Sequence, residues 1–410
     1  MASPITTPAP PEETVRDLAA SGSVRRAFAY FEARAAEINE EHARICAIPA
    51  PPFGEAERAE YLRARLAERG LEGATLDDEG NCLALRRGRE ETPPLVLSAH
   101  LDTVFPAGTD FTVRRDAVGR MRAPGIADDG SGLAALLALA GALGSCDIET
   151  RAPVLFVGTV GEEGEGDLRG VRHLLTRGEW AGRVGAFVSI DGPGLERITN
   201  AALGSRRYRV RCRGAGGHSW GDFGTPNPVH ALGRAVTRLA AYPAPRKPRT
   251  TFNVGRIEGG SGVNVIPREA TMDVDLRSES PEELGRLDAF FRRAVREAAE
   301  DETAARRAGT PPLELEVKLI GDRPGGQTPP DHALVRLASE ATRAVGSSPY
   351  LDCSSTDSNI AISLGVPAVT IGAGGVAAHT HTLDEWYDPR GRDLGLKRAL
   401  LLTLGAAGLA

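Results

Sequence analysis

Cysteine is scarce in this chain of 410 residues, and its five cysteines are scattered. Their number is odd and no two of them form a C-x-x-C pair, so the sequence indicates neither a disulfide framework nor a zinc site built from thiolates. We expect the cysteines to be small buried side chains in a reducing compartment, which favours a cytoplasmic location.

A basic excess is missing as well. The net charge is -6, and no basic stripe with interleaved aromatic residues occurs, so we expect no nucleic-acid partner. No apolar run is long enough to span a membrane, and we expect no membrane partner. The segment Met1–Glu13 lacks the basic region and apolar core of a secretory signal. We predict that residues 1–20 form a disordered tail.

Apolar strands alternate with helical patterns on both sides of the middle of the chain. Pro94–Ala99, Pro153–Val160 and Val184–Ile190 are continuous apolar runs. Continuous apolar strands separated by helices are typical of a sheet that is covered on both faces. We therefore predict one α/β domain formed by residues 21–204 and 321–410.

The pattern changes near Ser205. Tyr208–Arg213 alternates polar and apolar side chains, as a strand with one wet face does. The elements that follow have the order strand, helix, strand, strand, helix, strand, which can form an open-faced sandwich. We predict that residues 205–320 are a smaller α+β domain inserted into the first.

Acidic residues and histidines follow several of the predicted strands. His100 and Asp102 stand at the end of the first one, and side chains two residues apart on a strand share a face. The other positions of this kind are Asp128 and Asp129, Glu162 and Glu163, Asp191, and the stretch from His379 to Glu385. Each cluster alone is typical of a helix cap or a solvated acidic loop. Together they stand where open α/β sheets bind their ligands.

The donor set predicts a metal centre. Histidine, aspartate and glutamate without a thiolate suit zinc, with cobalt and manganese as alternatives. The number of acids indicates two metals that share one bridging carboxylate. In a rival hypothesis the acids only form solvated loops, and this hypothesis predicts no metal at all.

These residues resemble those of a dinuclear zinc peptidase and deacylase family, the M20 metallopeptidases. This family includes carboxypeptidase G, tripeptidase T, acetylornithine deacetylase and succinyl-diaminopimelate desuccinylase. The resemblance runs from about Ile45 to Trp386 and rests on the motifs H-L-D, A-D-D-G-S-G, G-E-E-G, I-D-G and H-T-L-D-E-W, in the family's order. It implies an α/β catalytic domain with a mixed sheet and an inserted ferredoxin-like α+β domain that serves as lid and dimerisation domain.

The resemblance implies a site for two zinc ions per subunit. Asp128 would bridge both ions, and the family commonly has a cis peptide between this residue and Asp129. The other implied ligands are His100 and Asp191 for the first ion, and Glu163 and His381 for the second. His379 is the alternative to His381, which we prefer because the residues after it match the family's motif.

Two further residues of this site have roles implied by the resemblance. Glu162 would be the general base, and Asp102 would orient His100 without binding the metal. A non-catalytic metal-binding scaffold on the same fold, a less favoured hypothesis, would be marked by the loss of Glu162 or of a ligand. The sequence retains all of them.

The inserted domain has roles implied by the resemblance alone. His218 matches a histidine that reaches the partner subunit's active site and hydrogen-bonds the developing oxyanion, so we expect a homodimer through this domain. Asn264 and Arg277 match substrate-binding positions of the lid, and a guanidinium suits a carboxylate. Gly374 and Gly375 are expected to offer backbone N–H groups to the substrate.

The implied function is that of a metal-dependent hydrolase. It would cleave a peptide bond of small peptides, as a di- or tripeptidase or a carboxypeptidase does, with a hydroxide that bridges the metals. The alternative is an N-acyl-amino-acid deacylase, an amidohydrolase. The stretches Trp220–Gly224 and Gly321–Gly325 are closer to the tripeptidase branch, whereas Gly130 and Ser131 stand where better-known members often have a lysine.

Overall fold

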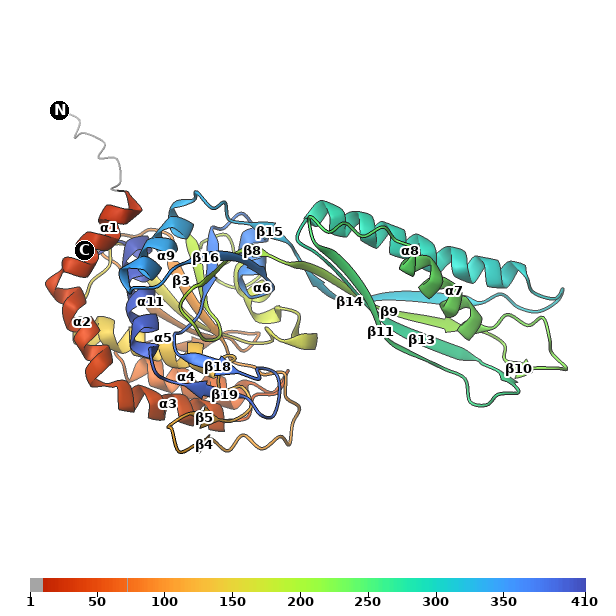
Figure 1. Ribbon diagram of the computed structural model, residues 1–410, viewed down its shortest axis with the longest axis horizontal. Coiled ribbons are helices and arrows are strands. Elements are labelled where there is room, and N and C mark those ends of the chain that lie inside the picture. The colour runs from red at the N-terminus through yellow and green to blue at the C-terminus, as the bar shows by residue number, and fades with distance from the viewer. Residues whose placement is uncertain (1–9, 72) are drawn as a thin grey trace, which may run out of the picture. The chain divides into compact units, whose positions relative to one another are not determined.

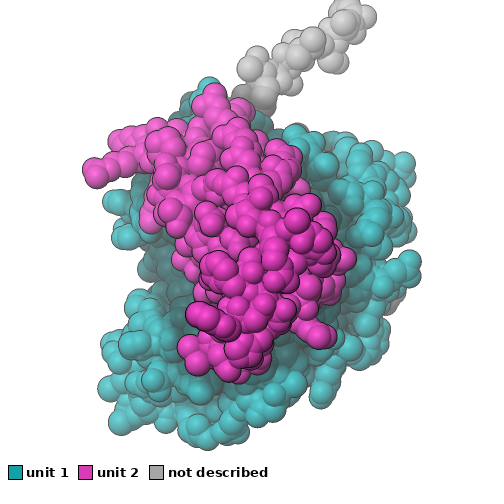
Figure 2. Space-filling model, turned by 90° about the vertical axis from the view of Figure 1, so that its right-hand side faces the viewer, with its two compact units in different colours: residues 1–202, 327–410 teal, residues 203–326 magenta. Residues whose placement is uncertain are grey.

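The computed structural model describes residues 10–71 and 73–410. The chain forms two compact units, labelled by element in Figure 1 and coloured separately in Figure 2. Unit 1 extends to Ala202 and resumes at Gln327, and unit 2 is Leu203–Gly326. The inserted domain is thus longer at both ends than the predicted residues 205–320, because its first and last strands along the chain extend beyond the stretches that the sequence pattern marks.

Unit 1 is built on a mixed sheet, for which the described residues supply nine strands. In spatial order these are β1 (Thr75–Leu76), β2 (Cys82–Arg86), β6 (Val154–Thr159), β3 (Leu95–His100), β7 (Ala186–Ile190), β17 (Ala368–Ile371), β8 (Arg197–Ala202) and β15 (Gly326–Gln327), with β16 (Tyr350–Ser354) paired to β8. The strands β6, β3, β7 and β17 are parallel, whereas β2 and β8 join them antiparallel. The predicted α/β class with a mixed sheet is confirmed.

Helices cover both faces of this sheet. Along β3, Leu95 and Leu97 belong to the core on one face, while Val96 belongs to the core on the other. This alternation explains why the strand is apolar throughout. One face is covered by α2 (Gly22–Ala33), α3 (Ala35–Ala47), α4 (Ala56–Ala67), α5 (Gly130–Ser145), α9 (Ala333–Ala344) and α11 (Arg392–Ala407), and the other by α6 (Arg169–Thr176) and α10 (Ser358–Ser363).

The predicted disordered tail is wrong for its second half. Pro11–Ala20 forms the helix α1, which packs on α9 and α11. Val15 and Leu18 on its inner face are buried, and this burial stabilises a segment whose composition alone suggests a loose end. Proline in the first turn is compatible with a helix because that turn needs no N–H donor from it. The first nine residues lie outside the described residues.

A second, small antiparallel sheet in unit 1 joins two distant loops. Its order is β18 (Val376–Ala378), β19 (Trp386–Asp388), β5 (Met121–Arg122) and β4 (Arg114–Arg115). The pairing of β19 with β5 places the segment after His381 beside the segment that leads to Asp128. This sheet therefore brings two of the predicted acid and histidine clusters together.

Unit 2 has the predicted six elements in the predicted order. These are β9 (Gly204–Arg213), α7 (Pro228–Ala240), β11 (Thr250–Gly259), β13 (Glu269–Ser278), α8 (Pro281–Ala304) and β14 (Glu314–Arg323). Two short strands that were not predicted, β10 (Gly217–His218) and β12 (Val265–Ile266), pair with each other. The large sheet has the order β11-β13-β9-β14 with antiparallel neighbours, which is the ferredoxin-like arrangement. Tyr208, Leu276 and Phe291 are among the residues of its core. Within the described ranges, no helix of either unit has the length and apolar character that a membrane crossing requires.

Candidate metal centre

The predicted acid and histidine clusters meet at one edge of the large sheet. His100 is the last residue of β3, Glu162 and Glu163 follow β6, and Asp191 follows β7. Because these three strands are parallel neighbours, their carboxyl ends lie side by side. The topology thus explains why residues far apart in the sequence share one site.

Two groups of metal-ligating side chains share Asp128. One group consists of His100, Asp128 and Asp191, and the other of Asp128, Glu163 and His381, with the ligand atoms of each group within 4.8 Å of one another. Oδ1 of Asp128 lies 2.8 Å from Nε2 of His100, and its Oδ2 lies 3.1 Å from Nε2 of His381. Each oxygen of one carboxylate therefore faces a different histidine, as a bridging ligand requires.

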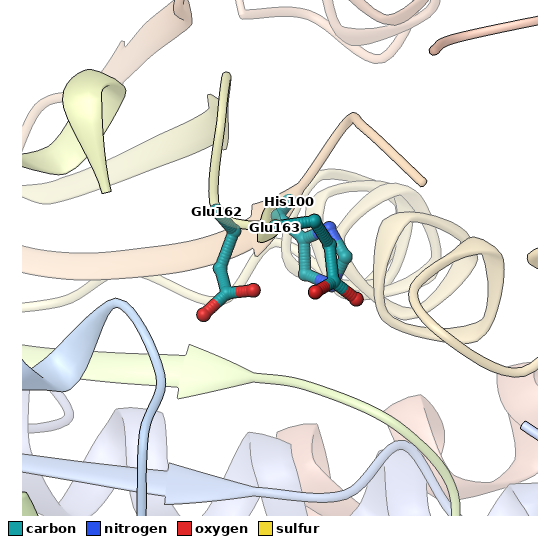
Figure 3. A group of neighbouring side chains, drawn as sticks. All are labelled: His100, Glu162 and Glu163. Atoms are coloured by element: carbon teal, nitrogen blue, oxygen red, sulfur yellow. The ribbon is translucent and has the colours of Figure 1, made fainter. Parts of the chain in front are cut away.

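Glu162 lies at the same place. Its carboxylate forms a third group with His100 and Glu163, again with atoms within 4.8 Å of one another (Figure 3). Glu162 is buried, with 5% of its surface exposed. A carboxylate in this position can accept a proton from a water molecule held between the ligand groups.

Asp102 fixes the geometry of its neighbours. The Nδ1 of His100 lies 3.0 Å from the backbone carbonyl oxygen of Asp102, which can only accept, so this nitrogen donates a proton and Nε2 is directed at Asp128. The Asp102 carboxylate accepts the backbone N–H groups of Glu162 and Glu163 at 2.9 and 2.8 Å. Its carboxylate oxygens are thus engaged by the backbone, as expected for an orienting residue.

The electrostatics of the site fit divalent cations. Burial and the neighbouring Asp128 carboxylate raise the pKa of Asp191 to about 7. Hydrogen bonds to Asp128 and Glu163 raise the pKa of His381 to about 10. Burial lowers the pKa of His100, but Asp102 and Asp128 outweigh it, and the pKa lies well above its usual value. The raised pKa values mean that the neighbouring carboxylates favour the protonated forms of these groups. Divalent cations at the site would replace these protons.

Two buried carboxylates of the site had no role assigned from the sequence. Asp129 caps α5 by accepting the Gly132 N–H at 3.0 Å, and it also accepts the backbone N–H of His100 at 3.1 Å. In the sequence, only its adjacency to Asp128 pointed to this residue, and the peptide bond between the two is cis, as expected.

Glu385 accepts three backbone N–H groups of the loop before Asp129. Burial raises the pKa of Glu385 to about 7, although these hydrogen bonds lower it. Its position in the H-T-L-D-E-W motif was the only sign of it.

His379 is exposed and does not belong to any of the three groups of ligating side chains in the described part of the chain. The Gly374 N–H donates to the Gly194 carbonyl at 3.1 Å, and a substrate-binding role for Gly374 stays a prediction. A role for Gly375, also with positive φ, stays a prediction.

The remaining predicted residues belong to unit 2 and are not part of the cluster. His218 ends β10 and is exposed, and its Nδ1 accepts the N–H groups of Trp220 and Gly221 at 3.2 and 3.3 Å. Asn264 is exposed in the loop before β12. Arg277 lies on β13 and its Nε donates to the Asp275 carboxylate at 2.6 Å, which leaves the outer nitrogens of its guanidinium for a ligand.

Comparisons with known proteins agree with this geometry. Residues 96–401 match the sequence profile of peptidase family M20/M25/M40. A Bacillus subtilis (strain 168) protein, uncharacterized protein YqjE, is 27% identical in an alignment of 353 positions that covers 83% of this chain and 91% of that protein. An acetylornithine deacetylase of Myxococcus xanthus is 29% identical in an alignment of 341 positions that covers 77% of this chain and 83% of that protein. The crystal structure of a Staphylococcus aureus tripeptidase has the same fold, with a TM-score of 0.75 and 21% identity over 90% of this chain and 98% of that one.

Proposed function

The chain belongs to peptidase family M20/M25/M40 and is a metal-dependent hydrolase, and we propose that it cleaves the peptide bond of small peptides at a centre of two zinc ions. The observation that carries the proposal is that both oxygens of Asp128 face histidines of two different ligand groups. His100 and Asp191 would complete the first zinc site, and Glu163 and His381 the second. When bound, the two cations supply Lewis acidity for the substrate carbonyl and lower the pKa of a water molecule.

Glu162 is the proposed general base. Its carboxylate lies with His100 and Glu163, so it is close to the water that the ligand groups would hold. It would accept a proton from this water as the water attacks the carbonyl, and then give the proton to the leaving amine. Asp102 supports this role because it holds the backbone of Glu162.

His218 is the proposed donor to the developing oxyanion, contributed by the partner subunit of a homodimer. Because its Nδ1 accepts two backbone N–H groups, the neutral ring has its proton on Nε2. That N–H is the group an oxyanion needs. Asn264 and Arg277 of the same unit are proposed to bind the substrate, the latter through a carboxylate.

An N-acyl-amino-acid deacylase is the second candidate. It is favoured by the 29% identity to a protein named acetylornithine deacetylase. Both reactions hydrolyse an amide and both need the same base and metal ligands, so the site alone does not separate them. Cobalt and manganese remain the alternatives to zinc, and a cytoplasmic location and the absence of a nucleic-acid or membrane partner stay predictions.

The test is a substrate panel. The metal-free full chain is reconstituted with Zn²⁺, Co²⁺ or Mn²⁺ and assayed with dipeptides, tripeptides and N-acetyl and N-succinyl amino acids. We expect the highest kcat/KM with a di- or tripeptide, measured by release of a free amine. Faster cleavage of the acyl amino acids would replace the first candidate by the second, and no cleavage of any substrate with any metal would refute both.

A further inference from the structure

The backbone of the loop that ends at Asp128 is buried, so its N–H and carbonyl groups need hydrogen-bond partners. Glu385 accepts hydrogen bonds from most of the N–H groups of residues 125–128. Its Oε1 accepts the N–H groups of Ala127 and Asp128 at 2.7 and 3.1 Å, and its Oε2 accepts that of Gly125 at 3.1 Å. Glu385 itself has no exposed surface. Buried hydrogen bonds to a charged acceptor are stronger than those between neutral groups.

Two carbonyl groups of this loop are hydrogen-bonded by other side chains, those of His42 and Ser131. Nε2 of His42 lies 2.6 Å from the carbonyl oxygen of Ile126, and the ring's other nitrogen contacts the Arg392 guanidinium. The hydroxyl of Ser131 donates to the carbonyl of Ala127 at 2.7 Å. The backbone before Asp128 is therefore bound at both its N–H and its carbonyl groups, and Glu385 is the carboxyl side chain of this framework.

Glu385 also belongs to the segment that contains a second proposed ligand. It stands four residues after His381, and its own N–H donates to the Thr382 carbonyl at 3.2 Å in the turn between them. Directly after it, β19 pairs with β5, in the register Trp386 with Arg122. One carboxylate thus joins the loop of Asp128 to the loop of His381, whose imidazole faces Asp128 at 3.1 Å.

We propose that Glu385 is a positioning residue of the metal centre, which sets the separation of Asp128 and His381 by binding the backbone of one ligand loop from within the other. This proposal rests on the proposed function, because it assumes that both residues bind metal. Glu385 does not touch the metals or the substrate in this proposal. It acts through Asp128, and its loss weakens the metal site that Asp128 and His381 share.

The carboxylate form of the side chain matters for this role. Three N–H donors approach two oxygens, so both oxygens must be acceptors. A glutamine offers one oxygen and one NH₂ group, which cannot accept from an N–H. Glu385→Gln therefore leaves either Gly125 or the pair Ala127 and Asp128 without an acceptor, although the size of the side chain is unchanged.

The test measures two quantities separately in the full chain: the protection of the loop's backbone amides and the affinity for the metal. Hydrogen exchange of the metal-free protein reports on the amides of residues 125–128, and stepwise titration with Co²⁺ against a chelating dye gives the affinity of each site. We expect Glu385→Gln to exchange these amides at least 10-fold faster and to bind one of two Co²⁺ ions about 10–100-fold more weakly. Glu385→Asp retains the carboxyl group with its two acceptor oxygens but has a shorter reach, and we expect intermediate values.

The matched control is Glu302→Gln in unit 2. Glu302 is also a buried carboxylate that accepts a backbone N–H, that of Asn227 at 3.0 Å. We expect this variant to lose stability while both Co²⁺ affinities stay as in the wild type. If Glu385→Gln behaves like the control, the positioning role is refuted; if it fails to fold, unchanged affinities in Glu385→Asp refute it. A wild-type chain that binds no Co²⁺ refutes the proposed function itself, which separates the two failures.

Discussion

Asp102 holds the backbone of Glu162, because its Oδ1 accepts the Glu162 N–H at 2.9 Å. Asp102 is fully buried two residues after β3, and its other oxygen accepts the N–H of Glu163 at 2.8 Å. Its backbone carbonyl oxygen also accepts the Nδ1 proton of His100. One residue thus orients the proposed base and two proposed ligands, which makes their relative positions a property of the fold.

Glu162→Gln is expected to retain both metals and to lose turnover. The amide keeps the size of the side chain but cannot accept a proton, and general bases contribute about 10²–10⁴-fold to the rate. The measurement is kcat together with metal content by mass spectrometry. The control is Glu165→Gln, an exposed acid of the same loop, with unchanged kcat. Wild-type turnover in Glu162→Gln would mean that the base is misassigned.

The two ligand groups predict different metal losses. Asp128→Asn is expected to lose both ions, because both groups contain Asp128, whereas His381→Ala is expected to lose only one. The metal content per chain after dialysis checks this difference. His379→Ala, an exposed histidine two residues away, is the control and should keep the full content. Equal losses in Asp128→Asn and His381→Ala would contradict a bridging carboxylate.

His218→Ala is expected to lower kcat by about 10²–10³-fold without loss of metal, because an oxyanion donor contributes that much. If this histidine acts in the partner subunit, a mixture of His218→Ala and Glu162→Gln chains regains activity. Each mixed dimer then has one site with an intact base and an intact donor. His230→Ala, an exposed histidine of unit 2, is the control. A mixture as inactive as its components, after subunit exchange is verified, would contradict a role in trans.

Glu41 is expected to stabilise the folded chain at neutral pH and to lose this effect at acidic pH. It is buried on α3; burial raises its pKa, but hydrogen bonds from Arg65 and Tyr61 outweigh this and lower the pKa below its usual value. Its contribution is therefore complete above the unfolded pKa of about 4.3 and is lost as the pH falls through the folded value. We expect Glu41→Gln to cost about 1.5–3 kcal/mol at pH 7.

Urea unfolding from pH 7 to pH 3 measures this contribution. The difference in free energy of unfolding between wild type and Glu41→Gln should shrink below about pH 4.3. Glu37→Gln on the same helix is the control, because its pair with Arg34 is exposed and contributes little. A difference that stays constant over the whole range would assign the loss to packing.

Much of the fold was predictable because the strands have clear patterns. The continuous apolar run of β3 predicted a strand in a sheet covered on both faces. The alternating run of β9 predicted a strand in a sheet with one face toward solvent. The helix α1 was missed because its stability comes from burial of Val15 and Leu18 against distant helices, which local composition does not reveal. Tertiary packing of this kind regularly overrides local preference.

The site was predictable where its residues directly follow apolar strands or belong to recognisable motifs, as Asp128 and His381 do. His100, Glu163 and Asp191 share an edge because their strands are parallel neighbours. Glu385 follows no strand of that sheet, and its role depends on backbone donors more than 250 residues earlier in the chain. A side chain that binds a backbone far away in the sequence does so at no fixed spacing, so a sequence pattern cannot predict this contact.

The strand order of the large sheet also has a consequence for biosynthesis. β17 lies between β7 and β8, although these two strands are consecutive in the sequence and β17 comes after all of unit 2. As the nascent chain leaves the ribosome, unit 2 emerges before β17 does, and the edge of β7 meanwhile remains an open template. The sheet whose strands end at the metal centre can therefore be completed only after the whole inserted unit has emerged.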